Sequence, residues 1–339
     1  MYEDDPIQRL IDVDYSRADT FGERACSLSR LISKGYNVPE GIVISTKVFK
    51  RFLNNLPGAK RIEHLFKTVT PENSEEIAKE IQEIIIYSPV PMPMANPIAE
   101  KIYSLLENIK SDSVVIRTSA HVEDSSRHVC SGRGVYFHLK DIRDIIKVMK
   151  NCWASAFSAD VLNDLMQAGL PPDNIRIAVI GQEMVSAKVC GIISVKNDPK
   201  DRNVHIRANW GSQVHGGENG IYCDQIIVNE AKIGEPLEIY TSYKDKISHI
   251  PPDTRHAVII DNPPEQKREL SLKQQEITAL TQLAKKVRRD FEVDYDIEFV
   301  FDQDGTLWLL DAIPRASHRN FQRIGTSVVQ TLNPTNNPD

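Results

Sequence analysis

The chain has 339 residues, enough for two lobes that each bury a core of their own. Its formal net charge of −6 gives no electrostatic basis for binding nucleic acid, and no apolar stretch approaches the ~20 residues that span a bilayer. The five cysteines are scattered without CxxC spacing, which favours buried thiols over disulfides or a zinc site, and the acidic N-terminal residues lack the apolar core of a secretory signal. We therefore expect a globular, cytoplasmic protein whose partners include neither nucleic acid nor a membrane.

The first half of the chain is predicted to be rich in helix. Residues 22–34 have the apolar spacing of an amphipathic helix that ends at Gly35, and an apolar strand is expected over residues 42–44. The remaining elements expected in this half are helices over 46–55, 74–86, 96–109 and 141–168, a strand over 113–117, and a polar segment over 118–133.

The second half changes to short β-rich runs. Strands are expected over 175–184, 189–195, 204–209 and 225–228, loop and weak strand over 244–269, and a helix over 271–290 with Ser271 as its cap. This division predicts an α/β (α+β) protein with a cleft between two lobes. We expect a helix-rich lobe over residues 1–180, a second lobe over 181–320 and a tail over 321–339.

A hairpin near the end of the chain is expected to bring two carboxylates together. Asp304-Gly305 is typical of a two-residue turn. Counting outward from it pairs Phe301 with Trp308 and Glu298 with Asp311. Opposed like charges destabilise a sheet unless a positive charge lies between them, and a hard divalent cation that also binds phosphate would supply one. A solvated acidic strand face is the alternative.

Several short blocks carry a resemblance to a known family. They lie in order at residues 22–28 (GERACSL), 38–44 (VPEGIVI), 115–120 (VIRTSA), 152–157 (CWASAF), 182–185 (QEMV), 296–298 (DIE) and 310–314 (LDAIP). Together they resemble the nucleotide-binding domain of the phosphoenolpyruvate synthase and pyruvate phosphate dikinase family, over roughly residues 20–315. The resemblance implies an ATP-grasp-like pair of lobes that binds ATP with Mg²⁺.

The resemblance also implies a set of site residues. Arg24 and Arg117 would contact phosphate and act in catalysis, and a guanidinium suits this role because it stays charged and donates in pairs. The other residues implied are Thr118, Ser119 and Gly132 at the phosphates, Gln182, Glu183, Met184 and Val185 around the adenine, Asp296 near the nucleotide, and Glu298 and Asp311 at the metal. Structural roles are the alternatives, namely an ion pair for Arg117, a plain turn for Gly132 and core packing for Met184.

Four positions depart from the family pattern. Arg24 stands where the family has Lys, Asp311 where it has Gln, and Ile313 where it has Arg. Arg315 would return to the same face if the strand continued past the proline before it. The loop that begins at Gly211 lacks the family's glutamate, although Glu218 is nearby, and the aspartate expected after that loop is Asp224.

Three functions remain open on the sequence alone. Full-length family members pass phosphate through a histidine on a separate domain, and none of the nine histidines here has that setting. The first hypothesis is therefore a phosphotransferase domain that phosphorylates a histidine of a partner domain or chain, and ultimately a small-molecule acceptor. The second is a stand-alone kinase or ligase that acts on a small molecule directly. The third is a degenerate nucleotide-binding domain.

Overall fold

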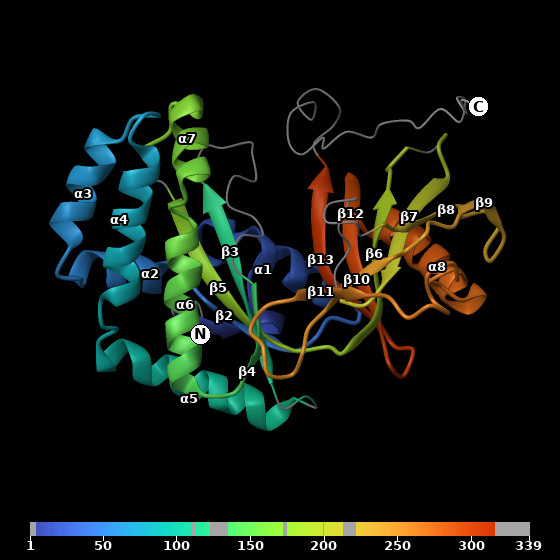
Figure 1. Ribbon diagram of the computed structural model, residues 1–339, viewed down its shortest axis with the longest axis horizontal. Coiled ribbons are helices and arrows are strands. Elements are labelled where there is room, and N and C mark those ends of the chain that lie inside the picture. The colour runs from blue at the N-terminus through green and yellow to red at the C-terminus, as the bar shows by residue number, and fades with distance from the viewer. Residues whose placement is uncertain are drawn as a thin grey trace.

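The computed structural model describes residues 5–109, 111, 113–122, 135–171, 175–198, 200–212 and 222–315. Two lobes lie side by side, one with helices gathered on a sheet and the other dominated by a larger sheet (Figure 1). The expected α+β class is therefore confirmed. The boundary expected between residues 180 and 181 falls inside a strand, and the chain passes from the first sheet to the second at residues 184–186.

The first lobe is built on an antiparallel sheet with the strand order β1-β2-β5-β3-β4. Its strands are β1 (Ile7–Arg9), β2 (Gly41–Ile44), β3 (Val114–Val122), β4 (Val135–Leu139) and β5 (Ile175–Glu183). Its helices are α2 (Thr46–Asn55), α3 (Ala59–Thr68), α4 (Ser74–Tyr87), α5 (Met92–Asn108), α6 (Ile142–Ser155) and α7 (Ala159–Ala168). The core between sheet and helices centres on Phe52, Trp153 and Phe157, all nearly inaccessible to solvent.

The second lobe is a six-stranded antiparallel sheet with the order β13-β12-β6-β7-β8-β9. Its strands are β6 (Ala187–Val195), β7 (Asn203–Trp210), β8 (Asp224–Asn229), β9 (Pro236–Tyr240), β12 (Asp294–Asp302) and β13 (Leu307–Arg315). Helix α8 (Gln274–Asp290) covers one face through a second apolar core. A separate two-stranded sheet is formed by β10 (Lys246–His249) and β11 (Val258–Asp261).

Helix α1 (Ala18–Ser33), which follows β1 and the short 3-10 helix η1 (Leu10–Asp12), packs between the first sheet and β13, in an apolar cluster that also contains the core of the second lobe. The helix is kinked at Gly22, whose φ is +76° and ψ 162°. A Cβ atom at this position would lie 2.1 Å from the carbonyl oxygen of Ser119 in β3. The Ser119 hydroxyl accepts from the Ala25 amide at 3.0 Å and donates to the Phe21 carbonyl at 2.9 Å, which fixes the kink against the first sheet.

The sequence located most elements but not every boundary. Helix α2 has its expected limits, whereas α1 and α5 begin earlier than expected. The single helix expected over 141–168 is the two helices α6 and α7, and β1, α3, β4 and β9 were not expected. The predicted cap at Ser271 is wrong. The Ser271 amide and hydroxyl both donate to Asp224 at 2.8 Å, because this buried carboxylate, paired with Lys244 at 2.6 Å, requires donors from all sides. Helix α8 begins after Lys273, whose amide donates to the Glu276 carboxylate at 2.6 Å.

Two expectations from composition concern cysteines and membranes. The four cysteines that the structure describes are free thiols, and three of them are buried. Among the described helices, none is both long and apolar enough to cross a bilayer.

The kink in α1 gives a test of the interface between helix and sheet. Gly22→Ala should destabilise the protein by roughly 1–3 kcal/mol more than Gly35→Ala, because the added methyl group meets the β3 backbone. Gly35 also has a positive φ, +70°, but no atom lies within 4 Å of the position that an added methyl group would take, so this variant isolates the backbone cost of about 1–2 kcal/mol. Urea unfolding of both variants measures the difference, and equal losses would contradict the close approach.

Candidate functional site

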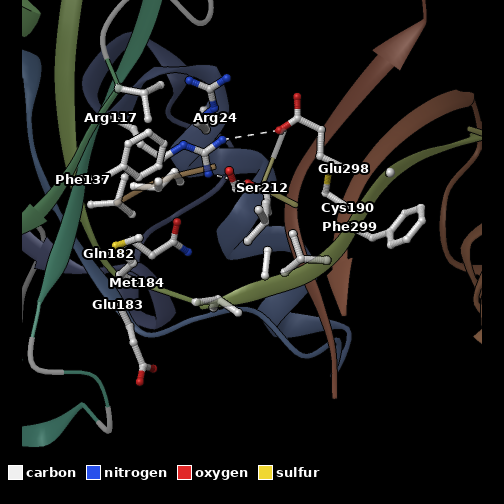
Figure 2. Close-up of a pocket in the computed structure, with 18 of the residues that line it drawn as sticks. Arg24, Arg117, Phe137, Gln182, Glu183, Met184, Cys190, Ser212, Glu298 and Phe299 are labelled. Carbon is white, nitrogen blue, oxygen red and sulfur yellow. Dashed lines mark hydrogen bonds and ion pairs between the residues drawn. The ribbon is translucent and has the colours of Figure 1, made fainter. Parts of the chain in front are cut away.

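A cavity of about 480 Å³ lies between the two lobes (Figure 2). Its lining falls into an apolar part and a charged part. The apolar part includes Val115, Phe137, Met184, Val185, Ala187, Ile192, Val300 and Leu310. The charged part contains Arg24, Arg117 and Glu298, and Glu183 is a further charged lining residue next to Met184. A site of this kind suits a ligand with one apolar end and one charged end.

The floor of the cavity is the face of the large sheet that α8 does not cover. Along β6, Val189, Ile193 and Val195 point into the core, so the alternate residues Cys190 and Ile192 point to the cleft. The register continues this face across the sheet, since Val300 lies opposite Cys190 and Glu298 opposite Ile192. Moving away from the connection between the lobes, the face therefore changes from apolar to charged.

The connection at residues 184–186 lies at the apolar end of the cavity, together with the predicted adenine-binding residues Gln182, Glu183, Met184 and Val185. The Met184 amide donates to the Ser113 carbonyl at 3.2 Å, and the Gln182 side chain donates to the Pro39 carbonyl at 3.0 Å. The Glu183 carboxylate accepts from the Ser111 amide at 3.1 Å. All four residues line the cavity, and their contact with a nucleotide stays a prediction.

The hairpin of β12 and β13 has the expected pairing for a reason that the sequence did not predict. The loop is one residue longer than expected, with Gly305 at φ +82°, and Phe301 therefore lies opposite Leu307 instead of Trp308. A bulge between Glu298 and Phe299 restores the register, so Glu298 does lie opposite Asp311.

Arg24 places a positive charge beside Asp311. Its guanidinium Nε donates to Asp311 Oδ2 at 2.7 Å and its Nη1 donates to the Thr118 carbonyl at 2.8 Å. Only 9% of the Arg24 side chain and 4% of the Asp311 side chain are exposed. Burial alone would lower the pKa of Arg24, but the charges of Asp311 and Glu298 outweigh burial and raise it.

Arg117 reaches the same hairpin from β3. Its Nη1 donates to the Leu310 carbonyl at 2.8 Å, and its Nη2 lies 3.5 Å from Glu298 Oε2 (Figure 2). Burial, with the neighbouring charge of Arg24, lowers the pKa of Arg117 to about 10. The group is therefore charged at neutral pH, and two guanidiniums occupy the position between the carboxylates where the sequence predicted a positive charge.

The two hairpin carboxylates differ in their fit to a metal ion. Asp311 is buried, and both of its oxygens are engaged, one by Arg24 and the other by the Ala312 amide at 2.9 Å. Glu298 is 37% exposed to the cleft. Burial and the charge of Asp311 raise the pKa of Glu298, which indicates a carboxylate without full compensation by a positive charge. Glu298 thus fits a cation and Asp311 does so only if Arg24 moves. The metal role of both stays a prediction, and no cluster of three or more potential metal ligands occurs in the described ranges.

Three further predicted residues, Thr118, Ser119 and Asp296, are not among the lining residues of the cavity. Thr118 contributes its carbonyl to Arg24, and the Ser119 hydroxyl is bonded to α1 on both sides. Asp296 lies one step beyond Glu298, where it is paired with Arg315 at 2.7 Å and accepts from Ser194 at 2.6 Å. Gly132 falls outside the described residues.

The structure also shows where Arg315 and Asp224, two other positions considered in the family pattern, lie. Strand β13 continues through Pro314, so Arg315 does return to the face of Asp311 and Ile313. Asp224 is completely buried on the opposite side of its sheet, bonded to Lys244 and Ser271. Glu218 falls outside the described residues.

A segment that the sequence predicted only as loop and weak strand roofs the cavity. We call residues 246–261 the strap. It starts at β10, which bridges to Gly211, and crosses to β4 in the first lobe (Figure 1). There the Phe137 amide donates to the Arg255 carbonyl at 3.0 Å, and Arg255 Nη2 donates to Asp144 at 2.9 Å. His138, next to this contact, has a φ of +53°. No periodic pattern in the sequence pointed to the strap.

The comparison with protein families decides what this site belongs to. The profile of the pyruvate phosphate dikinase AMP/ATP-binding domain matches residues 18–328. This chain is a member of that family.

The curated relatives are longer proteins. The chain is 26% identical to the phosphoenolpyruvate synthase of Aeropyrum pernix, over 83% of this chain and 38% of that protein. It is 27% identical to the prodigiosin synthesizing transferase PigC of Serratia marcescens, over 86% of this chain and 31% of that protein. It is 22% identical to the rifampicin phosphotransferase of Bacillus cereus, over 89% and 35%. The chain thus spans less than half the length of these relatives.

Similarities to solved structures are weaker. An ADP complex of N5-carboxyaminoimidazole ribonucleotide synthetase matches with a TM-score of 0.33 and 12% identity, over 65% of this chain and 39% of that one. The ATP-grasp ligase PsnB matches with a TM-score of 0.30 and 10% identity, over 91% and 56%.

The buried pair of Arg24 and Asp311 should contribute strongly to stability. Arg24→Met or Asp311→Asn, measured by chemical unfolding without divalent cations, should each cost about 3–5 kcal/mol, because each leaves a buried partner unpaired. The double variant should cost less than the two single losses added together. Arg61→Met is the matched control, since its pair with Glu80 is half-exposed and should cost under about 1 kcal/mol. Losses equal to that of Arg61→Met would contradict the buried pair.

The raised pKa of Glu298 predicts a pH dependence with a definite sign. The folded protein favours the protonated form, so the contribution of Glu298 to stability is complete below the ordinary value of 4.5 and is lost as pH rises through the folded pKa. Glu298→Gln cannot ionise, and its stability relative to the parent should therefore increase from pH 4 to pH 7. In Glu63→Gln the trend should reverse, because Lys67 lowers the pKa of Glu63. Unfolding curves across this pH range measure both trends, and a Glu298→Gln difference that does not change with pH would refute the assignment.

Proposed function

We propose that this chain binds ATP with Mg²⁺ in the cavity between its lobes and serves as the nucleotide domain of a phosphotransferase. The observation that carries the proposal is the polarity of the cavity, which is apolar at the connection between the lobes and charged at Arg117 and Glu298. Membership of the AMP/ATP-binding domain family supports the same ligand. Adenine suits the apolar end, which leaves the phosphates toward the charged end.

Each site residue has a distinct part in this proposal. Met184 and Val185 would pack on the adenine, with the backbone of the connection at its edge. Arg117, charged at neutral pH, would donate to phosphate while the Leu310 carbonyl orients its guanidinium. Arg24 would position the hairpin through Asp311, and its own contact with phosphate requires that this pair opens.

Mg²⁺ suits the exposed carboxylate of Glu298. Mg²⁺ is commonly held by one or two carboxylates together with the phosphates of its substrate. This agrees with a site in which Glu298 is open to the cleft and Asp311 is held by Arg24. When bound, the ion would neutralise phosphate charge, and the charge on Glu298 would then be compensated as well.

The acceptor of the phosphoryl group is proposed to lie outside this chain. The chain spans only 38% of the synthase from Aeropyrum pernix, so the rest of such a protein could carry the acceptor. The resemblance to the synthase and dikinase family favours a histidine of a partner domain or subunit, with a small molecule as the final acceptor.

Ligand binding gives a direct test. Addition of ATP with Mg²⁺ should stabilise the purified chain by about 2.7 kcal/mol at a hundredfold excess over the dissociation constant, because only the folded state binds. GTP should stabilise it less, since the edge of the connection would discriminate the base. Thermal unfolding with each nucleotide measures both effects, and no shift at millimolar ATP with Mg²⁺ would refute the proposal.

The products distinguish the possible reactions. A synthase-type reaction would yield AMP, one free phosphate and one acid-labile phosphate on a partner. A direct kinase would yield ADP and a phosphorylated small molecule, and a ligase would yield ADP, free phosphate and a ligated product. Binding without turnover, in the presence of a partner domain, would identify a degenerate nucleotide-binding domain. Chromatography of the nucleotide products separates these outcomes.

A further inference from the structure

The charged end of the cavity has no net positive charge of its own. The guanidinium of Arg24 is paired with Asp311, and that of Arg117 lies beside Glu298. One step further along the same sheet face, Arg315 is paired with Asp296. The positive and negative side chains of this region therefore cancel, although a nucleotide's phosphate chain carries several negative charges.

The register of the large sheet brings one further arginine to this face. Strand β7 alternates between buried Val204, Ile206 and Ala208 on the core side and exposed residues on the other, so Arg207 points away from the core. Arg207 lies directly opposite Ile192 on β6, and Ile192 lies opposite Glu298 on β12.

Arg207 and Glu298 are thus in one row across the sheet, separated only by a strand whose residue lines the cavity. Adjacent strands are about 4.8 Å apart, so the Arg207 backbone lies on the order of 10 Å from that of Glu298. Arg207 itself is not a lining residue of the cavity, but a long arginine side chain in this position can extend along the sheet face toward the charged end.

Arg207 is also uncommitted within the described part of the chain. Its guanidinium is exposed and makes no ion pair or hydrogen bond with any of the described residues. It differs in this from Arg24, Arg117 and Arg315, each of which is held by a carboxylate or a carbonyl group. An arginine whose donors have no partner among the described residues can bind phosphate without first breaking a buried pair there.

We propose that Arg207 binds the phosphate chain of the nucleotide and supplies the positive charge that the paired arginines do not. This inference rests on the proposed function. It assigns the recognition of phosphate to a residue on β7, across the sheet from the hairpin, while the hairpin positions the metal-binding carboxylate. Arg207 is then a determinant of selectivity for nucleotides with a phosphate chain over nucleosides.

The test compares ATP, ADP and adenosine as probes, each titrated in the presence of Mg²⁺ by calorimetry. Arg207→Ala should weaken ATP and ADP binding by roughly 10- to 100-fold, the effect of losing one charged hydrogen-bonding partner, and leave adenosine unchanged. Arg207→Lys should recover part of the loss, because it keeps the charge without the paired donors. Gln225→Ala, the exposed register partner of Arg207 on β8, controls for disturbance of the strand. Arg51→Ala, an exposed arginine on α2, controls for net charge.

The possible failures are distinguishable. If the parent chain binds ATP and Arg207→Ala binds it as tightly as Gln225→Ala does, the assignment of Arg207 is overturned and the proposed function stands. Equal losses for ATP and adenosine would overturn it too, because they would mark a structural role. If the parent chain binds none of the three ligands, the proposed function itself is refuted.

Discussion

The structure depends on two guanidiniums, one from α1 and one from β3, that contact the same hairpin of the second lobe. Arg24 is bonded to Asp311, and Arg117 is bonded to the Leu310 carbonyl next to it. Both side chains are more than nine-tenths buried. Loss of either contact would therefore leave a buried charge without its partner, at a large cost in free energy. The distance between the lobes, and with it the width of the cavity, is set by these contacts.

The same contacts explain why the site contains buried arginines and yet has no net positive charge. Cations that hold two lobes together must be neutralised where they are buried, and Asp311 does this for Arg24. The neutralised cations are then poorly available to an anionic ligand. Two charged side chains on the cleft face remain accessible to a ligand. The Glu298 carboxylate is partly exposed and has a raised pKa, and the Arg207 guanidinium is exposed and has no ion pair among the described residues.

Much of this arrangement could be predicted from the sequence, because its signals are local. Periodicity located most helices and strands, and short blocks of residues identified Arg24, Arg117, Glu298 and Asp311 as members of one site. The pairing of Arg24 with Asp311 could not be predicted, since 287 residues separate them and only the packing of α1 on β13 brings them together. The predicted register at the hairpin turn was wrong for a different reason. Its loop length and the bulge at Glu298 are both irregular, and their effects on the register cancel.

Other features were hidden because tertiary contacts override local preference. Ser271 was expected to cap a helix, but the buried Asp224 takes both its donors. Ser119 was expected at the phosphates, but its hydroxyl holds the kink of α1. The strap has no apolar periodicity, since it is stabilised by contacts with two lobes and has no core of its own. The alternation of apolar and polar residues along β7 predicts that Arg207 points away from the core. Which residues lie beside Arg207 becomes clear only from the pairing of β7 with the neighbouring strands.

The backbone hydrogen bond between the strap and β4 has a consequence for the motions of the molecule. The Phe137 amide belongs to the first lobe, and its acceptor, the Arg255 carbonyl, belongs to a segment anchored on the second. Exchange of this amide hydrogen with solvent therefore requires the strap to separate from β4, even while β4 itself stays folded. One backbone hydrogen thus reports the opening of the cavity separately from the unfolding of either lobe.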